Sequence, residues 1–173
     1  MFIESQQINS SPAGANGDFA PAGAREFQNA RRTINISCHE SFDTAVACAV
    51  DVSIENKRPR IHRATVAVDC GLAVNPLTIE SQFQGGVGFG LTQLMTKGAI
   101  TLADGRVEQR NFDGYAPPYI IDAPVMVDVH IVPSTEAPTG CGEPPVPVIS
   151  PAVVNALARL TGKRYRSLPL VNI

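Results

Sequence analysis

The segment most suggestive of chemistry is Pro138–Pro145, which reads PTGCGEPP. Two glycines flank Cys141, a single carboxylate follows at Glu143, and two prolines come directly after it. Glycine allows strained backbone angles, whereas proline removes backbone donors and stiffens the chain, so this segment is expected to hold Glu143 at a fixed position. If its surroundings bury it, Glu143 becomes a candidate general base. The alternative is that Glu143 caps a turn or pairs with an arginine.

Cys141 is the other reactive side chain of this segment. No histidine lies near it in the sequence, so a small buried thiol is favoured over a nucleophile. The chain has four cysteines and three histidines, without a CxxC pair and without clustering of the two residue types. We therefore expect no metal site made of protein side chains, and reduced thiols rather than disulfides.

A second notable segment is Gln82–Gly90, QFQGGVGFG, with four glycines inside a predicted helix. Each glycine costs about 0.5–1 kcal/mol relative to alanine in a helix interior. Such a helix must need a surface without side chains, either for close packing of another backbone or for close approach of a ligand. A dinucleotide-binding fingerprint is excluded because Leu91 stands where its third glycine belongs, and no Gly-Lys-Ser/Thr phosphate loop is present.

Alternating apolar residues predict the strands that must position these segments. They place strands at Ala45–Ile54 and Arg60–Cys70, which form an antiparallel hairpin, and another strand at Val125–Val132. A short second hairpin is expected from Ile100–Leu102 and Arg106–Glu108.

Capping signals predict two principal helices. Asn75 followed by a proline is typical of a helix start, and apolar residues at three- and four-residue spacing extend this helix over Pro76–Met95. Ser150 and Pro151 form a similar start for the second helix, which Gly162 ends. The order of elements predicts an α+β fold, a mainly antiparallel sheet with two principal helices packed on it.

Composition limits the classes of function. Lys and Arg total 14 against 16 Asp and Glu, and this net charge of −2 argues against a nucleic-acid-binding protein. Only 17% of residues are charged, below the roughly 25% of typical soluble domains, so we expect a partner to cover part of the surface. The chain contains no 18-residue apolar window for a membrane span and no visible export signal. A cytoplasmic location is therefore the default, with a periplasmic one if the parent complex is exported. Residues 1–32 lack an apolar period and are predicted to form a flexible arm, with residues 33–173 as the ordered part.

Four ordered motifs between Ile36 and Leu170 carry a resemblance to a known family. They are AVDCGLAVNP (Ala67–Pro76), QFQGGVGFGL (Gln82–Leu91), DGRVEQRNFDGY (Asp104–Tyr115) and PTGCGEPPVPVISPAVVNAL (Pro138–Leu157). In these motifs the chain resembles the C-terminal part of the molybdopterin-binding large subunit of the xanthine dehydrogenase and aldehyde oxidase family. Within that family it looks most like the isoquinoline 1-oxidoreductase β-subunit and the membrane-associated aldehyde dehydrogenases.

The resemblance implies a role for each candidate residue. It implies that Glu143 is the catalytic base, that Gln82 contacts the pterin of the molybdopterin cofactor, and that Gly85, Gly86 and Gly142 lie against this cofactor. The implied reaction is the hydroxylation of an aldehyde or N-heteroaromatic substrate with water-derived oxygen. The cofactor, in its simple or its cytosine dinucleotide form, would hold the metal through its own dithiolene, and iron–sulfur clusters would lie only on a partner subunit.

Two departures from the family pattern limit these expectations. Relatives carry an arginine in the stretch that here reads APPYIID (Ala116–Asp122), which has no basic residue. The family subunit is also several times longer, so this chain is expected to be a fragment of a molybdopterin-binding domain. It would be inactive without the upstream portion of the large subunit and an iron–sulfur subunit. The alternative is a non-catalytic orphan domain or interaction module from a truncated gene.

Overall fold

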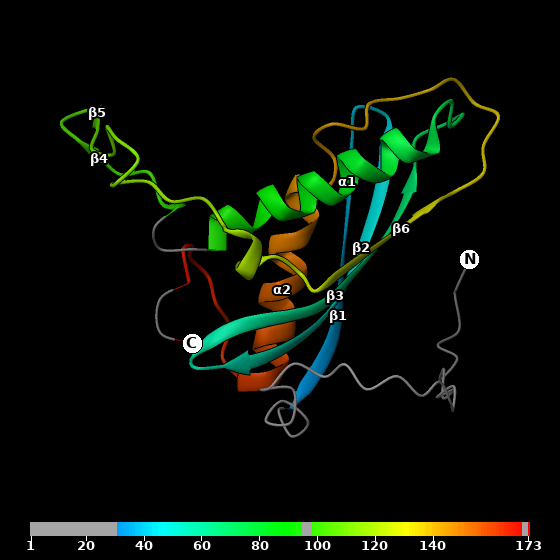
Figure 1. Cartoon of the computed structure of the whole chain (residues 1–173). Helices are drawn as coiled ribbons and strands as arrows, with labels where there is room; N and C mark the ends of the chain where they lie inside the picture. The colour runs from blue at the N-terminus through cyan, green and yellow to red at the C-terminus, as the bar shows by residue number, and fades with distance from the viewer. Residues whose placement is uncertain (1–30, 95–97, 171–172) are drawn as a thin grey trace, which may run out of the picture.

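The computed structural model describes residues 31–94, 98–170 and 173 of the chain. Its centre is a four-stranded sheet of order β1-β2-β3-β6, with helices α1 and α2 on one face (Figure 1). The predicted α+β fold with a mainly antiparallel sheet is thereby confirmed. The predicted arm lies, except for its last two residues, outside the described residues.

The predicted hairpin forms the middle of the sheet. It consists of β2 (Thr44–Glu55) and β3 (Arg58–Asp69), which pair antiparallel through a tight turn at Asn56 and Lys57. Both turn residues have positive φ, 50° and 60°, as a two-residue hairpin turn requires. One face of each strand is buried beneath the helices.

A strand that the periodicity did not predict forms one edge of the sheet. This strand, β1 (Arg32–Ser41), pairs antiparallel with β2. Its alternation is reversed relative to the core, because Ile34 and Ile36 are exposed whereas the polar residues between them face the helix side. The sequence of β1 therefore lacks the apolar alternation on the core side by which a strand is usually predicted.

The other edge, β6 (Met126–Ile131), agrees with the predicted third strand and pairs parallel to β3. The second predicted hairpin is present as the short strands β4 (Leu102–Ala103) and β5 (Arg106–Val107). Figure 1 shows this hairpin projecting away from the body of the molecule. A short helical turn, η4 (Ile120–Asp122), leads from the hairpin towards β6.

The first helix begins as predicted. Helix α1 (Pro76–Gly90) starts at Asn75, whose side-chain oxygen accepts a hydrogen bond from the Thr78 N–H. It ends earlier than the periodicity indicated, because the chain tightens into the 3₁₀ turn η2 (Leu91–Leu94). No described helix is long and apolar enough to cross a membrane.

The second helix begins earlier than predicted. Helix α2 (Val146–Thr161) has Pro151 in its interior, and Gly162 ends it in the left-handed conformation, as expected. Ser150 is therefore not the N-cap. It is buried, and its hydroxyl donates to the Gly90 carbonyl of α1 at 2.7 Å, which joins the two helices.

Both helices and the sheet share one hydrophobic core. Phe83 and Val87 of α1 are fully buried against α2 and the sheet. The other core residues with no exposed surface are Cys48, Val50, Val52, Ala64, Val66, Val68, Val148, Ile149, Ala152, Val153, Ala156 and Leu157.

Candidate functional site

The segment that carries Glu143 is fastened to the sheet before it enters α2. The Thr139 N–H donates to the Cys70 carbonyl at 2.9 Å, at the end of β3. The Thr44 hydroxyl lies 2.6 Å from both the Thr139 hydroxyl and the Gly140 carbonyl, and it is completely buried. Cys70 and Thr44, which are far from the segment in the sequence, therefore hold its start at Thr139 and Gly140. Thr44 could not be found from local sequence, because it stands as a single polar residue at the start of an otherwise apolar strand.

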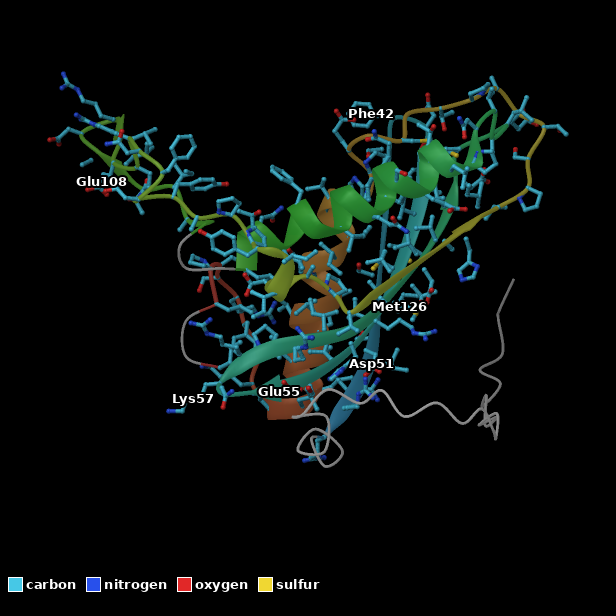
Figure 2. All side chains as sticks on the ribbon, viewed as in Figure 1. Phe42, Asp51, Glu55, Lys57, Glu108 and Met126 are labelled. Atoms are coloured by element: carbon cyan, nitrogen blue, oxygen red, sulfur yellow. The ribbon has the colours of Figure 1, made fainter. Side chains whose placement is uncertain are left out.

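Gly140 allows the next contact. Its N–H donates to the Phe42 carbonyl at 3.2 Å, in the turn between β1 and β2. A Cβ atom at Gly140 would lie 2.8 Å from Cβ of Phe42, so a side chain here would displace the segment from this turn. Phe42 itself is exposed and is labelled in Figure 2.

Glu143 lies at the start of α2, and its side chain is exposed. Its carbonyl accepts the Val146 N–H at 2.9 Å in the first turn, while Pro144 and Pro145 are buried beneath it. Burial, the condition under which Glu143 would become a candidate general base, is not provided by the described residues of this chain. Within the described residues Glu143 has no ion-pair partner, so pairing with an arginine is not seen either. The carboxylate stands on a buried support and faces outward.

The glycines of α1 divide into two kinds. A Cβ atom at Gly90 would lie 2.6 Å from Cγ2 of Ile149 and closer still to the Val146 carbonyl oxygen, and one at Gly86 would overlap the ring of Pro145. Gly85 and Gly88, in contrast, have open space where a Cβ atom would be. Close backbone packing thus explains two of the four glycines, and the other two leave a bare surface.

The contact between Gly86 and Pro145 brings the two candidate segments together. Gln82 lies on α1 one turn before Gly86, and residues four apart share one face of a helix. Glu143 lies two residues before Pro145. Gln82 and Glu143 are both exposed and both lie close in sequence to this contact, and Gly85 and Gly142 have open space where a side chain would begin.

The thiol beside this contact is not activated. Burial, with the neighbouring Cys70 thiol as a second cause, raises the pKa of Cys141 to about 11. A thiol with this pKa is almost wholly protonated at neutral pH, and only the thiolate is a nucleophile. The interpretation of Cys141 as a small packed thiol is favoured by its partial burial against the core.

The histidines lie elsewhere. His62 on β3 is 2.8 Å from the Ser53 hydroxyl and 3.8 Å from a Glu55 carboxylate oxygen. Burial and the nearby Arg32 guanidinium lower its pKa, and these effects exceed the opposing influence of Glu55. No group of three or more His, Cys, Asp or Glu side chains in the described parts of the chain is arranged to hold a metal ion.

Arg60, a basic residue of the sheet, contacts the Ala116–Asp122 stretch, which has no basic residue of its own. Arg60 on β3 donates to the Ile121 carbonyl at 3.1 Å, and Asp122 accepts the Tyr119 N–H at 3.1 Å to close the turn. Ile120 and Ile121 are both exposed. Arg60 thus holds the backbone of this stretch from the neighbouring strand.

A family model described as "Molybdopterin cofactor-binding domain" matches residues 5–124. The match begins within the stretch predicted to be an arm, includes Gln82, Gly85 and Gly86, and ends before Glu143.

Two relatives show the same similarity. The chain is 32% identical over 125 residues to the membrane-bound aldehyde dehydrogenase [pyrroloquinoline-quinone] of Gluconacetobacter polyoxogenes. The aligned region covers 71% of this chain and 16% of that protein. It is 32% identical over 110 residues to the isoquinoline 1-oxidoreductase subunit beta of Brevundimonas diminuta, covering 64% of this chain and 14% of that protein.

A solved structure has the same fold. The crystal structure of quinoline 2-oxidoreductase from Pseudomonas putida 86 aligns with a TM-score of 0.60 at 20% identity, over 73% of this chain and 17% of that one. The chain therefore corresponds to about one sixth of the length of these proteins.

Proposed function

The chain belongs to the molybdopterin-binding xanthine dehydrogenase and aldehyde oxidase family, and from this premise we propose that it forms one wall of a molybdenum cofactor cleft in an oxidoreductase. The enzyme would hydroxylate an aldehyde or an N-heteroaromatic substrate with water-derived oxygen. The observation that carries the proposal is the close approach of Gly86 to Pro145, which joins the helix of Gln82 to the segment of Glu143 and supports a shared cofactor surface there.

The shape of this surface fits a flat cofactor. Gly85, Gly88 and Gly142 have open space within 4 Å of where a side chain would begin, so a ring system could approach the backbone there. The Gln82 amide, exposed at the edge of this surface, offers both donors and an acceptor to a pterin. Molybdopterin would supply the metal and the redox chemistry when bound, and this explains why the described residues need no metal-ligating cluster.

Glu143 would act as the general base. Its carboxylate oxygen would take the proton from the water-derived oxygen that is transferred to the substrate, and its support on buried Pro144 and Pro145 fixes its position. A carboxylate removed from water becomes a stronger base. Because Glu143 is exposed in this chain, that step would require a covering portion opposite it.

The surface around α1 supports such a covering portion. Leu77 is 73% exposed and Phe89 is 63% exposed on the same helix, and Leu72 and Val74 are exposed just before it. Leu72, Val74 and Leu77 lie within six residues of one another at the start of the helix, and exposed large apolar side chains that lie together usually mark a surface that another portion covers. We propose that the upstream part of a longer large subunit covers it, with the cofactor in the cytosine dinucleotide form and with electrons leaving through an iron–sulfur subunit. One wall alone cannot exclude water or orient a substrate, so the isolated chain should be inactive.

The test uses the enzyme assembled from this chain and its covering portion. Glu143→Gln should lower turnover by about 10²–10⁴-fold, the usual contribution of a general base, without changing the molybdenum content. Glu136→Gln, at an exposed carboxylate in the same connection, is the matched control and should leave turnover unchanged. Turnover retained in Glu143→Gln would refute the catalytic role.

Cofactor content tests the other half of the proposal. Gln82→Ala should lower the molybdenum and pterin content, measured by elemental analysis and by fluorescence of the oxidised pterin. Because the name of one relative includes pyrroloquinoline quinone, the same sample should be assayed for this quinone. Quinone in place of molybdenum and pterin would refute the proposed molybdenum cleft. An assembled protein that contains neither cofactor would favour the second candidate function, a non-catalytic interaction module, which the exposure of Glu143 supports.

A further inference from the structure

The edge strand β1 has its apolar side facing away from the core. Ile34 is 64% exposed and Ile36 is 55% exposed, and Cys38 is exposed beside them. Thr33, Asn35 and the residues that alternate after them face α2 instead. A strand with this reversed alternation exposes apolar surface on a sheet face that no described element covers.

The backbone of β1 is also unpaired on its outer edge. The Ile36 N–H donates to the Asn35 side chain at 2.9 Å, and the Ile34 carbonyl accepts from the Arg159 guanidinium at 3.5 Å, so neither group bonds β2. In an extended strand the N–H and C=O of one residue point to the same edge, and alternate residues point to opposite edges. The even-numbered residues of β1 therefore present their backbone groups on the free edge. Proteins usually protect such an edge with prolines, bulges or inward charges, and β1 has none of these within Arg32–Ser41.

We propose that two copies of this chain associate through antiparallel pairing of their β1 strands about a twofold axis at Ile36. In this register Ile36 lies opposite Ile36 of the second copy, Ile34 lies opposite Cys38, and Arg32 lies opposite Glu40. All of these residues are even-numbered, so their backbone groups face the partner strand and their side chains share the outer face of the joined sheet. The two sheets become one sheet of eight strands.

Charge complementarity selects this register. Arg32, Asp51 and Arg159 line one shallow depression at the start of β1, and Arg32 binds Asp51 at 3.0 Å. Figure 2 shows Asp51 beside this end of the strand. Two guanidinium groups and one carboxylate leave an excess of one positive charge, which Glu40 of the second copy neutralises. When the Ile34 carbonyl accepts a backbone N–H of the second copy, the Arg159 guanidinium is released to bind this carboxylate.

Other registers lose this match. A shift of two residues places Arg32 opposite Cys38 or beyond the end of the strand, and a shift of one residue turns the free backbone groups away from each other. Parallel pairing would place Arg32 beside Arg32. The twofold register is therefore the one in which the charges, the apolar residues and the backbone groups of β1 are all complementary.

The mass of the full chain in solution tests the proposal. Sedimentation equilibrium should show a dimer, and Glu40→Lys or Arg32→Glu alone should each raise the dimer Kd at least tenfold, because like charges then face each other twice. Mixing these two variants should restore association as a heterodimer, since every facing pair is again opposite in charge. Glu136→Lys, a charge reversal far from β1 in the sequence, should leave the Kd unchanged.

Crosslinking tests the register directly. In a Cys38→Ser background, Ile36→Cys should form a disulfide between two chains under mild oxidation, because facing residues of paired strands lie within disulfide distance. A chain that remains monomeric at 100 μM or more would overturn the proposal. So would a dimer whose Kd is indifferent to Glu40→Lys and that does not form the Ile36→Cys crosslink, since another surface would then hold it.

Discussion

Alanine at Gly90 is expected to destabilise the protein, whereas alanine at Gly88 on the same helix should stabilise it. Both substitutions replace a glycine in the last turn of α1, so the gain from each is at most the value of about 0.5–1 kcal/mol that holds for a helix interior. Only at Gly90 does the new methyl group meet other atoms, because it would lie 2.6 Å from Cγ2 of Ile149 and closer to the carbonyl oxygen of Val146. Overpacking of this kind costs about 1–3 kcal/mol, and a backbone carbonyl has little freedom to move aside.

The two variants should therefore differ by about 2 kcal/mol in their free energy of unfolding, since the gain in helix propensity is common to both. Urea unfolding followed by far-ultraviolet circular dichroism measures this difference, provided that the slopes of the two transitions agree. Equal stability of Gly90→Ala and Gly88→Ala would refute the close packing of α1 on the start of α2.

Alanine variants at the two open glycines of α1 distinguish helix packing from cofactor binding. Gly85→Ala and Gly88→Ala, where a methyl group meets open space, should keep or raise the stability of the chain. In the assembled enzyme they should lower the cofactor content, because the methyl group would occupy the proposed pterin surface. Normal molybdenum and pterin content in both variants would argue against cofactor contact at these two glycines.

Three further predictions concern groups near the sheet. The pKa of His62 is lowered in the folded chain, so the unfolded chain binds a proton at this histidine more readily. The free energy of unfolding should therefore fall as the pH decreases below 6.5. His62→Gln should remove this pH dependence in urea titrations from pH 7.5 to 5, and identical pH curves for the two proteins would contradict the prediction. Thr44→Val should cost about 1–3 kcal/mol, because the Gly140 carbonyl loses a buried partner, and it should speed hydrogen exchange at the Gly140 amide. Unchanged exchange would show that other contacts hold the segment. The pKa of Cys141 is raised from 9.0 to about 11, so its thiolate fraction at pH 8 is about 100-fold below that of a free cysteine. Iodoacetamide should therefore label Cys141 correspondingly slowly, as followed by mass spectrometry. Labelling at the rate of a free cysteine would be incompatible with this burial.

Elements whose apolar side faces the core were predictable from periodicity. The alternation in β2 and β3 and the spacing of Phe83 and Val87 in α1 have a direct physical cause, the burial of one face. Strand β1 was not predictable in the same way, because its apolar residues face outward and its turn to β2 contains no glycine. The start of α2 was misplaced because a serine before a proline is the usual sign of an N-cap, whereas Ser150 makes a contact between helices that depends on the tertiary structure.

The candidate site was located by local sequence, but its environment was not. The glycines and prolines around Glu143 indicated a fixed carboxylate, which the hydrogen bonds of Thr139 and Gly140 support. The exposure of Glu143 depends on what lies opposite it, and local sequence does not encode this. The two roles of the α1 glycines were likewise unresolved until α2 was placed, because only its position distinguishes Gly86 and Gly90 from Gly85 and Gly88.

The fastening of the Pro138–Pro145 segment to the sheet has a consequence for the order of folding. Strands β1, β2 and β3 are joined by tight turns and can associate early, since little chain entropy is lost in closing them. Thr44 meets Thr139 across 95 residues, and Ser37 meets Val148 across 111 residues, after the chain has passed through α1 and returned as β6. Contacts of such long range form slowly. We therefore expect the surface that carries Glu143 to form after strands β1, β2 and β3 have paired.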